Sequence, residues 1–62
     1  MGNDMDISIV IPARNEELTI YSVVCAAKQH SAVKEIIVVD NASTDRTQER
    51  AISAGATVVE CS

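Results

Sequence analysis

The stretch V-K-E-I-I-V-V-D-N-A-S-T-D-R-T, residues 33–47, decides the fold of this chain. Residues 36–39 are an unbroken run of β-branched side chains, which favour extended backbone. A run without polar alternation is typical of a strand covered on both faces, as in parallel sheets. The run stops at Asp40, and the residues behind it favour turns and helix starts. The sequence therefore predicts a buried parallel strand that ends at Asp40 just before a helix, where open α/β sheets bind ligands.

The same pattern occurs once earlier in the chain. Residues 6–11 predict a first strand, and Pro12, which lacks a backbone N–H, marks its end. Asn15 suits a helix N-cap, and Glu16 and Glu17 suit the first turn of a helix that reaches residue 29 or 30. We interpret the two polar strand ends as two walls of one site.

The remaining elements complete an α/β pattern. We expect strands at 35–39 and 56–60, and a second helix from residue 44 or 45 to residue 54, stopped by Gly55 in a left-handed conformation. Right-handed crossovers then give three parallel strands in the order 3-2-1, a three-layer β-α-β-α-β Rossmann-like half. We expect residues 1–5 to be a frayed start. Residues 6–62 are then a partial domain that stops after its third strand, as in the N-terminal piece of a longer protein.

Composition narrows the partners and the compartment. The formal net charge of −4 argues against a nucleic-acid or anionic-membrane surface. Cys25 and Cys61 are far apart, and we expect buried free thiols rather than a disulfide or a metal pair. Residues 1–6 lack the lead of a signal peptide, and no apolar run approaches the roughly 20 residues that span a bilayer. We therefore expect a cytoplasmic protein.

Recognition, rather than a chemical step, is what the polar residues indicate. The glycine-rich phosphate loops G-x-G-x-x-G and G-x-x-x-x-G-K-[ST] are absent, and so are H-E-x-x-H and Cys/His metal spacings. Asp40 can accept a hydrogen bond from a nucleobase N–H, and Glu16 can accept from ribose hydroxyls. Arg14 can stack on a base or meet a phosphate, because its guanidinium is planar and always charged.

Two segments of the chain resemble family 2 glycosyltransferases with the type A fold. They are I-S-I-V-I-P-A-R-N-E-E, residues 7–17, and I-I-V-V-D-N-A-S-T-D-R-T, residues 36–47. Members of that family typically open with strand-P-x-x-N-E and carry D-D-G-S-x-D-x-T after the second strand. The resemblance covers residues 7–60 and implies the N-terminal part of a nucleotide-diphospho-sugar transferase fold.

The resemblance also implies a ligand and its binding residues. The parent enzyme would take a sugar from a UDP- or GDP-sugar donor and transfer it to an acceptor. By position, Pro12, Ala13 and Glu16 would line the nucleoside pocket, and Asp40 would meet the base. The full predicted nucleotide-binding set is Pro12, Ala13, Arg14, Glu16, Asp40 and Asn41.

This sequence departs from the family pattern at three positions. Arg14 stands where many members have Tyr, and Asn41 replaces the second Asp and so removes a charge. Ala42 replaces the Gly, which predicts a turn without a positive φ. We interpret Ser43, Thr44 and Asp45 as capping residues rather than ligand contacts.

The metal-binding D-x-D of the family lies beyond a further strand and helix, and its catalytic base lies later still. Asp45 belongs to the D-D-G-S-x-D-x-T motif and is not the metal acid. We therefore expect no catalytic residue, no metal ligand and no bound cofactor in this chain, and no sugar transfer by the chain alone. The parent enzyme is expected to use Mg²⁺ or Mn²⁺ with its nucleoside-diphosphate sugar.

Two other readings of the sequence stay open at this stage. A receiver-like doubly wound domain also places acids at strand ends, although it wants paired acids after its first strand. A non-catalytic interaction module would instead pair the open edge of the first strand with another chain, and such an edge favours self-association.

Overall fold

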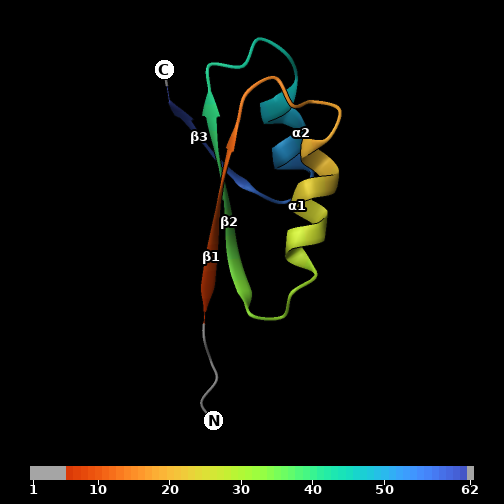
Figure 1. Cartoon of the computed structure of the whole chain (residues 1–62), viewed down its shortest axis with the longest axis vertical. Helices are drawn as coiled ribbons and strands as arrows, with labels where there is room; N and C mark the ends of the chain where they lie inside the picture. Colours follow the sequence, from red (N-terminus) through yellow and green to blue (C-terminus); the bar gives the residue numbers. More distant parts are fainter. Residues whose placement is uncertain (1–5, 62) are drawn as a thin grey trace.

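The computed structural model describes residues 6–61, so the start predicted at residues 1–5 lies outside the described residues. Five elements follow in the order β1 (Ile7–Ala13), α1 (Ile20–Lys28), β2 (Val33–Asn41), α2 (Thr47–Ser53) and β3 (Thr57–Cys61) (Figure 1). The strands form one parallel sheet in the order β1-β2-β3. This confirms the predicted α/β topology, with β2 in the centre.

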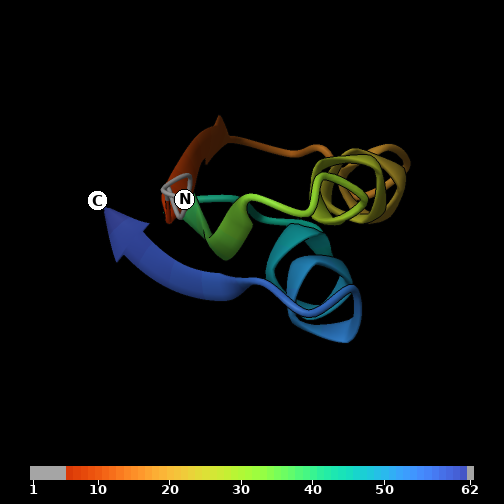
Figure 2. The ribbon, with the colours of Figure 1, turned by 90° about the horizontal axis from the view of Figure 1, so that it is seen from below.

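Both helices lie against one face of the sheet, and the other face carries no layer from the described residues (Figure 2). Side chains from β2 fill the centre of the covered face, because Ile36 and Val38 are buried there. The helices contribute Ile20 and Val24 from α1 and small side chains from α2. The described residues therefore form two layers around an aliphatic core, so the predicted three-layer arrangement was wrong for them, because both crossovers place their helices on the same face.

The small residues of α2 bring it close to the sheet. Thr47, Ala51 and Ala54 are buried, as the helical spacing predicts. Gly55 ends the helix with φ 103°, and the N–H of Ala56 donates to the carbonyl of Ala51 at 3.0 Å. This bond, with the one from Gly55 N–H to Ile52, forms the Schellman pattern that a glycine stop favours. The predicted left-handed stop is confirmed.

Strand and helix ends differ from the predictions most at β1 and α1; β2 also covers residues 33–41 rather than 35–39, and α2 begins at Thr47 rather than at residue 44 or 45. β1 continues through Pro12 to Ala13, because it is an edge strand of the described sheet and an edge strand tolerates a residue without an N–H. α1 begins at Ile20, and Glu16 and Glu17 precede it in a turn rather than in its first helical turn. Thr19 holds the N-cap position and makes no side-chain capping bond. Asn15 as the helix N-cap was therefore wrong.

The open face of the sheet keeps apolar side chains partly in solvent. Val10 is 59% exposed and Val59 is 49% exposed, and the β2 residues between them in the register, Ile37 and Val39, are half-buried. Both cysteines are free, Cys25 half-buried and Cys61 exposed, so the prediction of a buried thiol was wrong at Cys61. Neither helix within residues 6–61 is long and apolar enough to cross a membrane.

Candidate functional site

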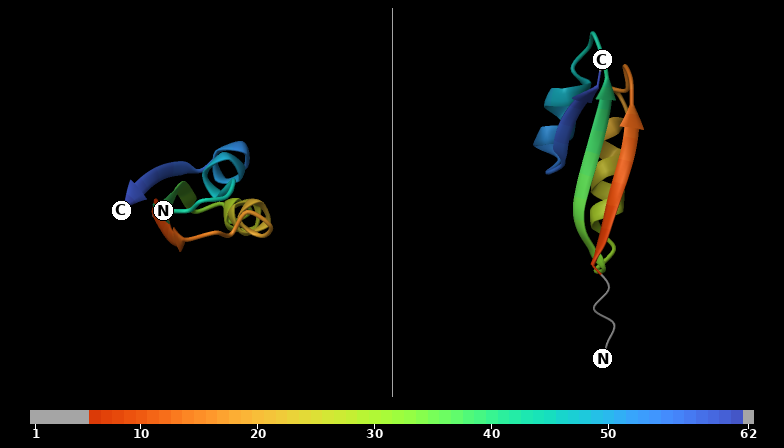
Figure 3. Two further views of the ribbon diagram at one scale, coloured as in Figure 1. Left: turned by 90° about the horizontal axis from the view of Figure 1, so that it is seen from above. Right: turned by 90° about the vertical axis from the view of Figure 1, so that its left-hand side faces the viewer.

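Two loops meet at the carboxyl edge of the sheet. The first loop, residues 14–19, joins β1 to α1, and the second loop, residues 42–46, joins β2 to α2. They are neighbours because Ala13 and Asp40 are register partners at the ends of adjacent parallel strands. The right-hand view of Figure 3 shows β1 and β2 ending at this same edge. The structure thus brings the two sequence motifs together, as predicted.

The first loop donates three consecutive backbone N–H groups to side chains of the second motif. The bonds are Asn15 N–H to Ser43 Oγ at 2.8 Å, Glu16 N–H to Thr47 Oγ1 at 2.8 Å, and Glu17 N–H to Asp45 Oδ2 at 3.3 Å. A backbone N–H that is left unpaired away from water costs free energy of folding. The three side chains avoid this cost by accepting these hydrogen bonds. The alternate spacing of acceptors at positions 43, 45 and 47 explains the S-x-D-x-T part of the motif.

The positions between those acceptors send hydrogen bonds back to the first loop. Thr44 N–H donates to Asn15 Oδ1 at 2.9 Å, and Arg46 N–H donates to Glu17 Oε1 at 3.1 Å. The Asn15 carboxamide and the Glu17 carboxylate are therefore ties between loops. With each such bond contributing about 1 kcal/mol, the reciprocal set joins the two loops into one unit. We call these five bonds the loop clamp.

Asp40 lies beneath this clamp and is fully buried. Its Oδ1 accepts from the Ser43 hydroxyl, and its Oδ2 accepts from Ser43 N–H at 3.2 Å and from Gln48 Nε2 at 2.7 Å. Burial acts to raise the pKa of Asp40, but the hydrogen bonds from Ser43 and Gln48 outweigh it and hold the pKa below its ordinary value. Asp40 is therefore an ionised acceptor at neutral pH.

Asp45 is the second acid that the motif holds in place. Its Oδ1 accepts from both the hydroxyl and the N–H of Thr47, the latter at 2.9 Å. Desolvation acts to raise the pKa of Asp45, and the bonds from Thr47 and from the Glu17 N–H lower it overall. The prediction that Asp45 serves local structure agrees with these contacts, which join the start of α2 to the first loop.

Each loop contains one non-glycine residue with a positive φ. Asn15 has φ 52° and Ala42 has φ 53°. Asn tolerates this region, whereas Ala bears a cost of about 1–2 kcal/mol there. The prediction that Ala42 indicates a turn without a positive φ was wrong. The turn keeps its shape because Ser43, the next residue, bonds Asp40 through both its N–H and its hydroxyl.

Two hollows open beside the first loop. One, about 220 Å³, lies against β1 and the start of α1 and is lined in part by Pro12, Ala13 and Glu16. The other, about 370 Å³, lies between the loops and is bordered by Asn15, Glu16 and Asp45. Glu16 lines both hollows, and its Oε1 accepts from the hydroxyl of Thr19 at 3.1 Å. Three of the six predicted nucleotide-binding residues thus border one hollow.

The other three predicted residues lie apart from that lining. Arg14 is exposed next to the hollows, and Asn41 is exposed at the end of β2. Asp40 is covered by Ser43 and Gln48. The side chains of Arg14, Asn41 and Asp40 border neither of these two hollows. The enclosure of the Asp40 carboxylate by Ser43 and Gln48 was not predicted from the sequence.

Thr47 and Gln48 are site residues that the sequence analysis missed. The helical spacing places Thr47 on the sheet-facing side of α2, and its hydroxyl in addition joins both loops. Gln48 was given no role, and it reaches back from the first turn of α2 to Asp40. These two roles could have been inferred from the position of the motif at the start of a helix. Side chains in the first turn of that helix lie close to the end of the preceding strand.

The acids of the described residues do not fit a metal site. Within residues 6–61, no three His, Cys, Asp or Glu side chains gather around a point that could hold a metal ion. Asp40 and Asp45 have their oxygens engaged by hydrogen-bond donors of the chain itself. No step through a metal is therefore assigned to these residues.

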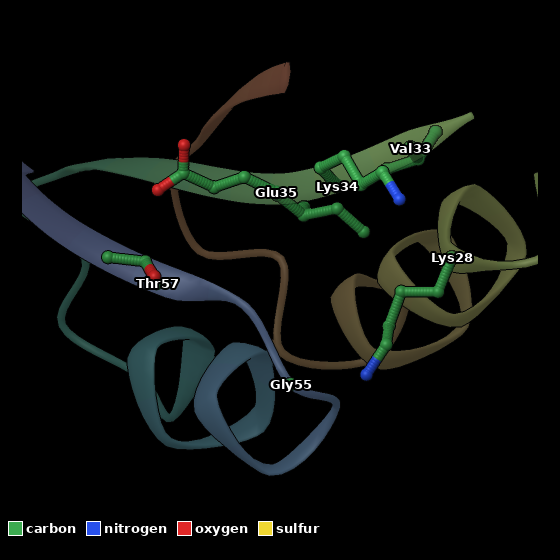
Figure 4. A pocket seen from close by; sticks show the side chains of 7 residues that line it. Lys28, Val33, Lys34, Glu35, Gly55 and Thr57 are labelled. Carbon is green, nitrogen blue, oxygen red and sulfur yellow. The ribbon is translucent and has the colours of Figure 1, made fainter. Parts of the chain in front are cut away.

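A third hollow lies at the amino edge of β2 and β3, away from both loops. It measures about 580 Å³ and is lined by Lys28, Val33, Lys34, Glu35, Ile36, Gly55 and Thr57 (Figure 4). Lys28 Nζ donates to the carbonyl of Ala54 at 3.2 Å and so meets the last turn of α2. No residue of the two loops lines this hollow.

Comparison with known proteins places the chain among sugar transferases. The model of the family described as glycosyl transferase family 2 matches residues 8–60. Glucosyl-3-phosphoglycerate synthase of Mycolicibacterium smegmatis is 51% identical over 55 residues, which are 86% of this chain and 18% of that protein. The 4,4'-diaponeurosporenoate glycosyltransferase of Staphylococcus aureus is 41% identical over 58 residues, which are 94% of this chain and 16% of that protein.

Solved structures agree with these relatives. Glucosyl-3-phosphoglycerate synthase from Mycobacterium tuberculosis, in complex with Mg²⁺ and UDP, superposes with a TM-score of 0.79 at 48% identity. The match covers 90% of this chain and 21% of that one. The same enzyme has been solved with Mn²⁺, UDP-glucose and glycerol 3-phosphate, again with a TM-score of 0.79. This chain therefore spans less than a fifth of the length of the curated relatives it matches.

Proposed function

The chain belongs to glycosyl transferase family 2, and we propose that it is the donor-nucleotide-binding part of an enzyme that transfers a sugar from a UDP-sugar to an acceptor. The observation that carries this proposal is the loop clamp. It fixes the two motif loops as one edge beside hollows that Pro12, Ala13 and Glu16 line. A rigid edge of this kind is prepared to bind a ligand without ordering its loops first.

Uridine diphosphate is the nucleotide that the comparisons favour. Relatives at 48% identity have been solved with UDP and with UDP-glucose. The GDP-sugar alternative has no comparable support, and neither does self-association through the sheet edge. The cytoplasmic location also stays a prediction from the sequence.

The side chains can divide the recognition of the nucleoside between them. The apolar rings and methyl groups of Pro12 and Ala13 offer a surface for the flat base and the sugar, and Glu16 offers a carboxylate oxygen to ribose hydroxyls. Arg14 is exposed beside the hollows, where its guanidinium can stack on the base or bind a phosphate oxygen. Asn41, at the end of β2, supplies an amide at the mouth of the site.

A divalent cation accompanies UDP in the related structures. The carboxylates described here are engaged by hydrogen bonds and do not fit such an ion. These residues therefore bind and orient the nucleoside, and the chain is proposed not to transfer sugar by itself. The interaction-module reading is retained only as the outcome of a failed nucleotide test.

The test compares two isosteric changes at opposite edges of the sheet. Glu16→Gln replaces the proposed acceptor of ribose hydroxyls beside the first loop. Glu35→Gln makes the same chemical change beside the hollow at the amino edge of the sheet. We expect UDP to bind the unchanged chain in a calorimetric titration, Glu16→Gln to weaken binding about tenfold, and Glu35→Gln to leave it unchanged. Equal effects of the two changes, or no binding of UDP by the unchanged folded chain, would overturn the proposal.

A further inference from the structure

Thr19 occupies the N-cap position of α1 without capping the helix. A threonine at this position usually accepts a hydrogen bond from a backbone N–H in the first turn. The side chain of Thr19 makes no such bond, and its hydroxyl donates instead to Glu16 Oε1 at 3.1 Å. The start of α1 does not require this bond, so its role is to be sought at Glu16.

The backbone fixes Thr19 and Glu16 one turn apart. The N–H groups of Thr19 and Ile20 both donate to the carbonyl of Glu16, at 3.0 Å and 2.8 Å. The N–H of Glu16 donates to Thr47 Oγ1 in the loop clamp. Because the backbone of Glu16 is bonded on both sides, only its side chain remains to be ordered. The Thr19 hydroxyl supplies the contact that orders it.

The Glu16 carboxylate lies where a ligand can reach it. Glu16 and Thr19 both line the two hollows beside the first loop, and both side chains are exposed. Each oxygen of a carboxylate can accept hydrogen bonds. The Thr19 hydroxyl bonds Oε1, and within residues 6–61 no donor reaches Oε2. The contact therefore holds one oxygen and leaves the other to a ligand in the hollows.

We propose that Thr19 is a positioning residue of the nucleoside pocket: its hydroxyl holds the Glu16 carboxylate so that Oε2 is ready to accept from the ribose. The pocket then selects ribonucleotides over nucleotides that lack the ribose hydroxyls. This inference rests on the proposed function, because it deepens the role of Glu16 there. A glutamate side chain loses much rotamer freedom when it is fixed, and ordering it before the ligand arrives removes that cost from binding.

The experiment uses two changes at position 19 and a matched control. Thr19→Val removes the hydroxyl and keeps the branched shape, and Thr19→Ser keeps the hydroxyl. Thr57→Val makes the first change at an exposed position of β3 that lines the hollow at the amino edge. Each chain is titrated by calorimetry with UDP and with its dideoxy analogue, which lacks both ribose hydroxyls.

The two nucleotides separate positioning from general damage to the loop. The unchanged chain should bind UDP about tenfold more tightly than the analogue. Thr19→Val should bind UDP about fivefold more weakly and the analogue as before, since only UDP uses the ordered carboxylate. Thr19→Ser and Thr57→Val should keep the tenfold preference. A preference that survives in Thr19→Val, or equal weakening of both nucleotides, contradicts the proposal.

A measurement without ligand separates this inference from the proposed function. Three-bond NMR couplings report whether the Glu16 side chain holds one rotamer or averages over several. We expect one rotamer in the unchanged chain and averaging in Thr19→Val. If UDP binds no folded variant while the couplings change in this way, the proposed function is wrong and the positioning contact stands. If the couplings are already averaged in the unchanged chain, or do not respond to Thr19→Val, the positioning role is wrong.

Discussion

The two edges of the sheet are built in different ways. At the carboxyl edge, five reciprocal bonds join residues that are 28 to 31 positions apart in the chain. At the amino edge, two side-chain bonds within residues 6–61 join elements beside an open hollow: Lys28 Nζ donates to the carbonyl of Ala54, and Ser8 Oγ donates to Glu35 Oε1 at 3.4 Å. Polar side chains at the first edge are used to fix backbone, whereas at the second they are largely left to solvent. The difference indicates which edge is prepared for a ligand.

The clamp also changes how the motif is understood. Asn15, Glu17, Ser43, Asp45 and Thr47 are recognisable in the sequence as a pair of polar loops, and the structure uses all five to join the loops. We propose that the surfaces left for a ligand are those of Pro12, Ala13 and Glu16, which line a hollow beside the first loop. Much of the motif thus builds the site rather than contacting what binds there.

Thr47→Val should produce the largest loss of stability. Thr47 is fully buried, accepts from Glu16 N–H and donates to Asp45. Valine has nearly the same shape but leaves that N–H unpaired, which we expect to lower the free energy of unfolding by about 2–3 kcal/mol. Urea denaturation measures the loss, and Thr47→Ser, which keeps the hydroxyl, should recover most of it. Equal losses for Val and Ser would show that packing, not the clamp, is what matters.

Gly55→Ala tests the amino edge and should cost less. At φ 103° an added Cβ is strained, and it would clash with Lys28 Nζ. Because the end of Lys28 can move, we expect a loss of about 1–2 kcal/mol, with little change in the loops. Gly55→Asn should lose less, since Asn tolerates positive φ better. Chemical shifts of Asn15 and Ser43 that move in Gly55→Ala would contradict the independence of the two edges.

Ala42→Gly should be a small gain at the carboxyl edge. Glycine removes the strain of φ 53° but gives the unfolded chain more freedom, so the net stabilisation is about 0.5–1 kcal/mol. Thermal unfolding measures it, and Ala54→Gly, in a buried position at the end of α2, is the control that should destabilise. A loss on Ala42→Gly would mean that the turn is not strained.

The smallest expected effect is a change in how steeply the free energy of unfolding depends on pH. The folded-state pKa values of Asp40 and Asp45 lie below their ordinary value of 3.8. Their contribution to stability is therefore complete above that value and is lost as pH falls through the lowered folded-state pKa values. Urea denaturation from neutral to acid pH should show this fall, and Asp40→Asn should flatten it, unlike Asp6→Asn at an exposed position. An unchanged slope in Asp40→Asn would contradict the hydrogen-bond account.

The topology could be predicted because it follows from local pattern. The apolar runs, the small face of α2 and Gly55 each carry a signal within a few residues, and handedness fixes the strand order. The clamp could not be predicted, because it pairs single residues about 30 positions apart. Residues of these types are equally common as helix N-caps, so the sequence does not show which role they take. Asn15 is the clearest case: its side chain suits an N-cap, and the neighbouring loop takes it instead. The positive φ of Ala42 could not be predicted for a different reason: alanine has no preference for that region, and local bonds from Ser43 to Asp40 hold the turn.

An amide-resolved NMR titration of the chain with UDP tests the central claim most directly. The account predicts saturable shifts at residues 13–16 and 40–48, with Lys28, Lys34 and Thr57 unmoved at the other edge. Shifts confined to Lys28, Lys34 and Thr57, or a well-dispersed spectrum that UDP never changes, would contradict the assignment of the nucleotide to the clamped edge.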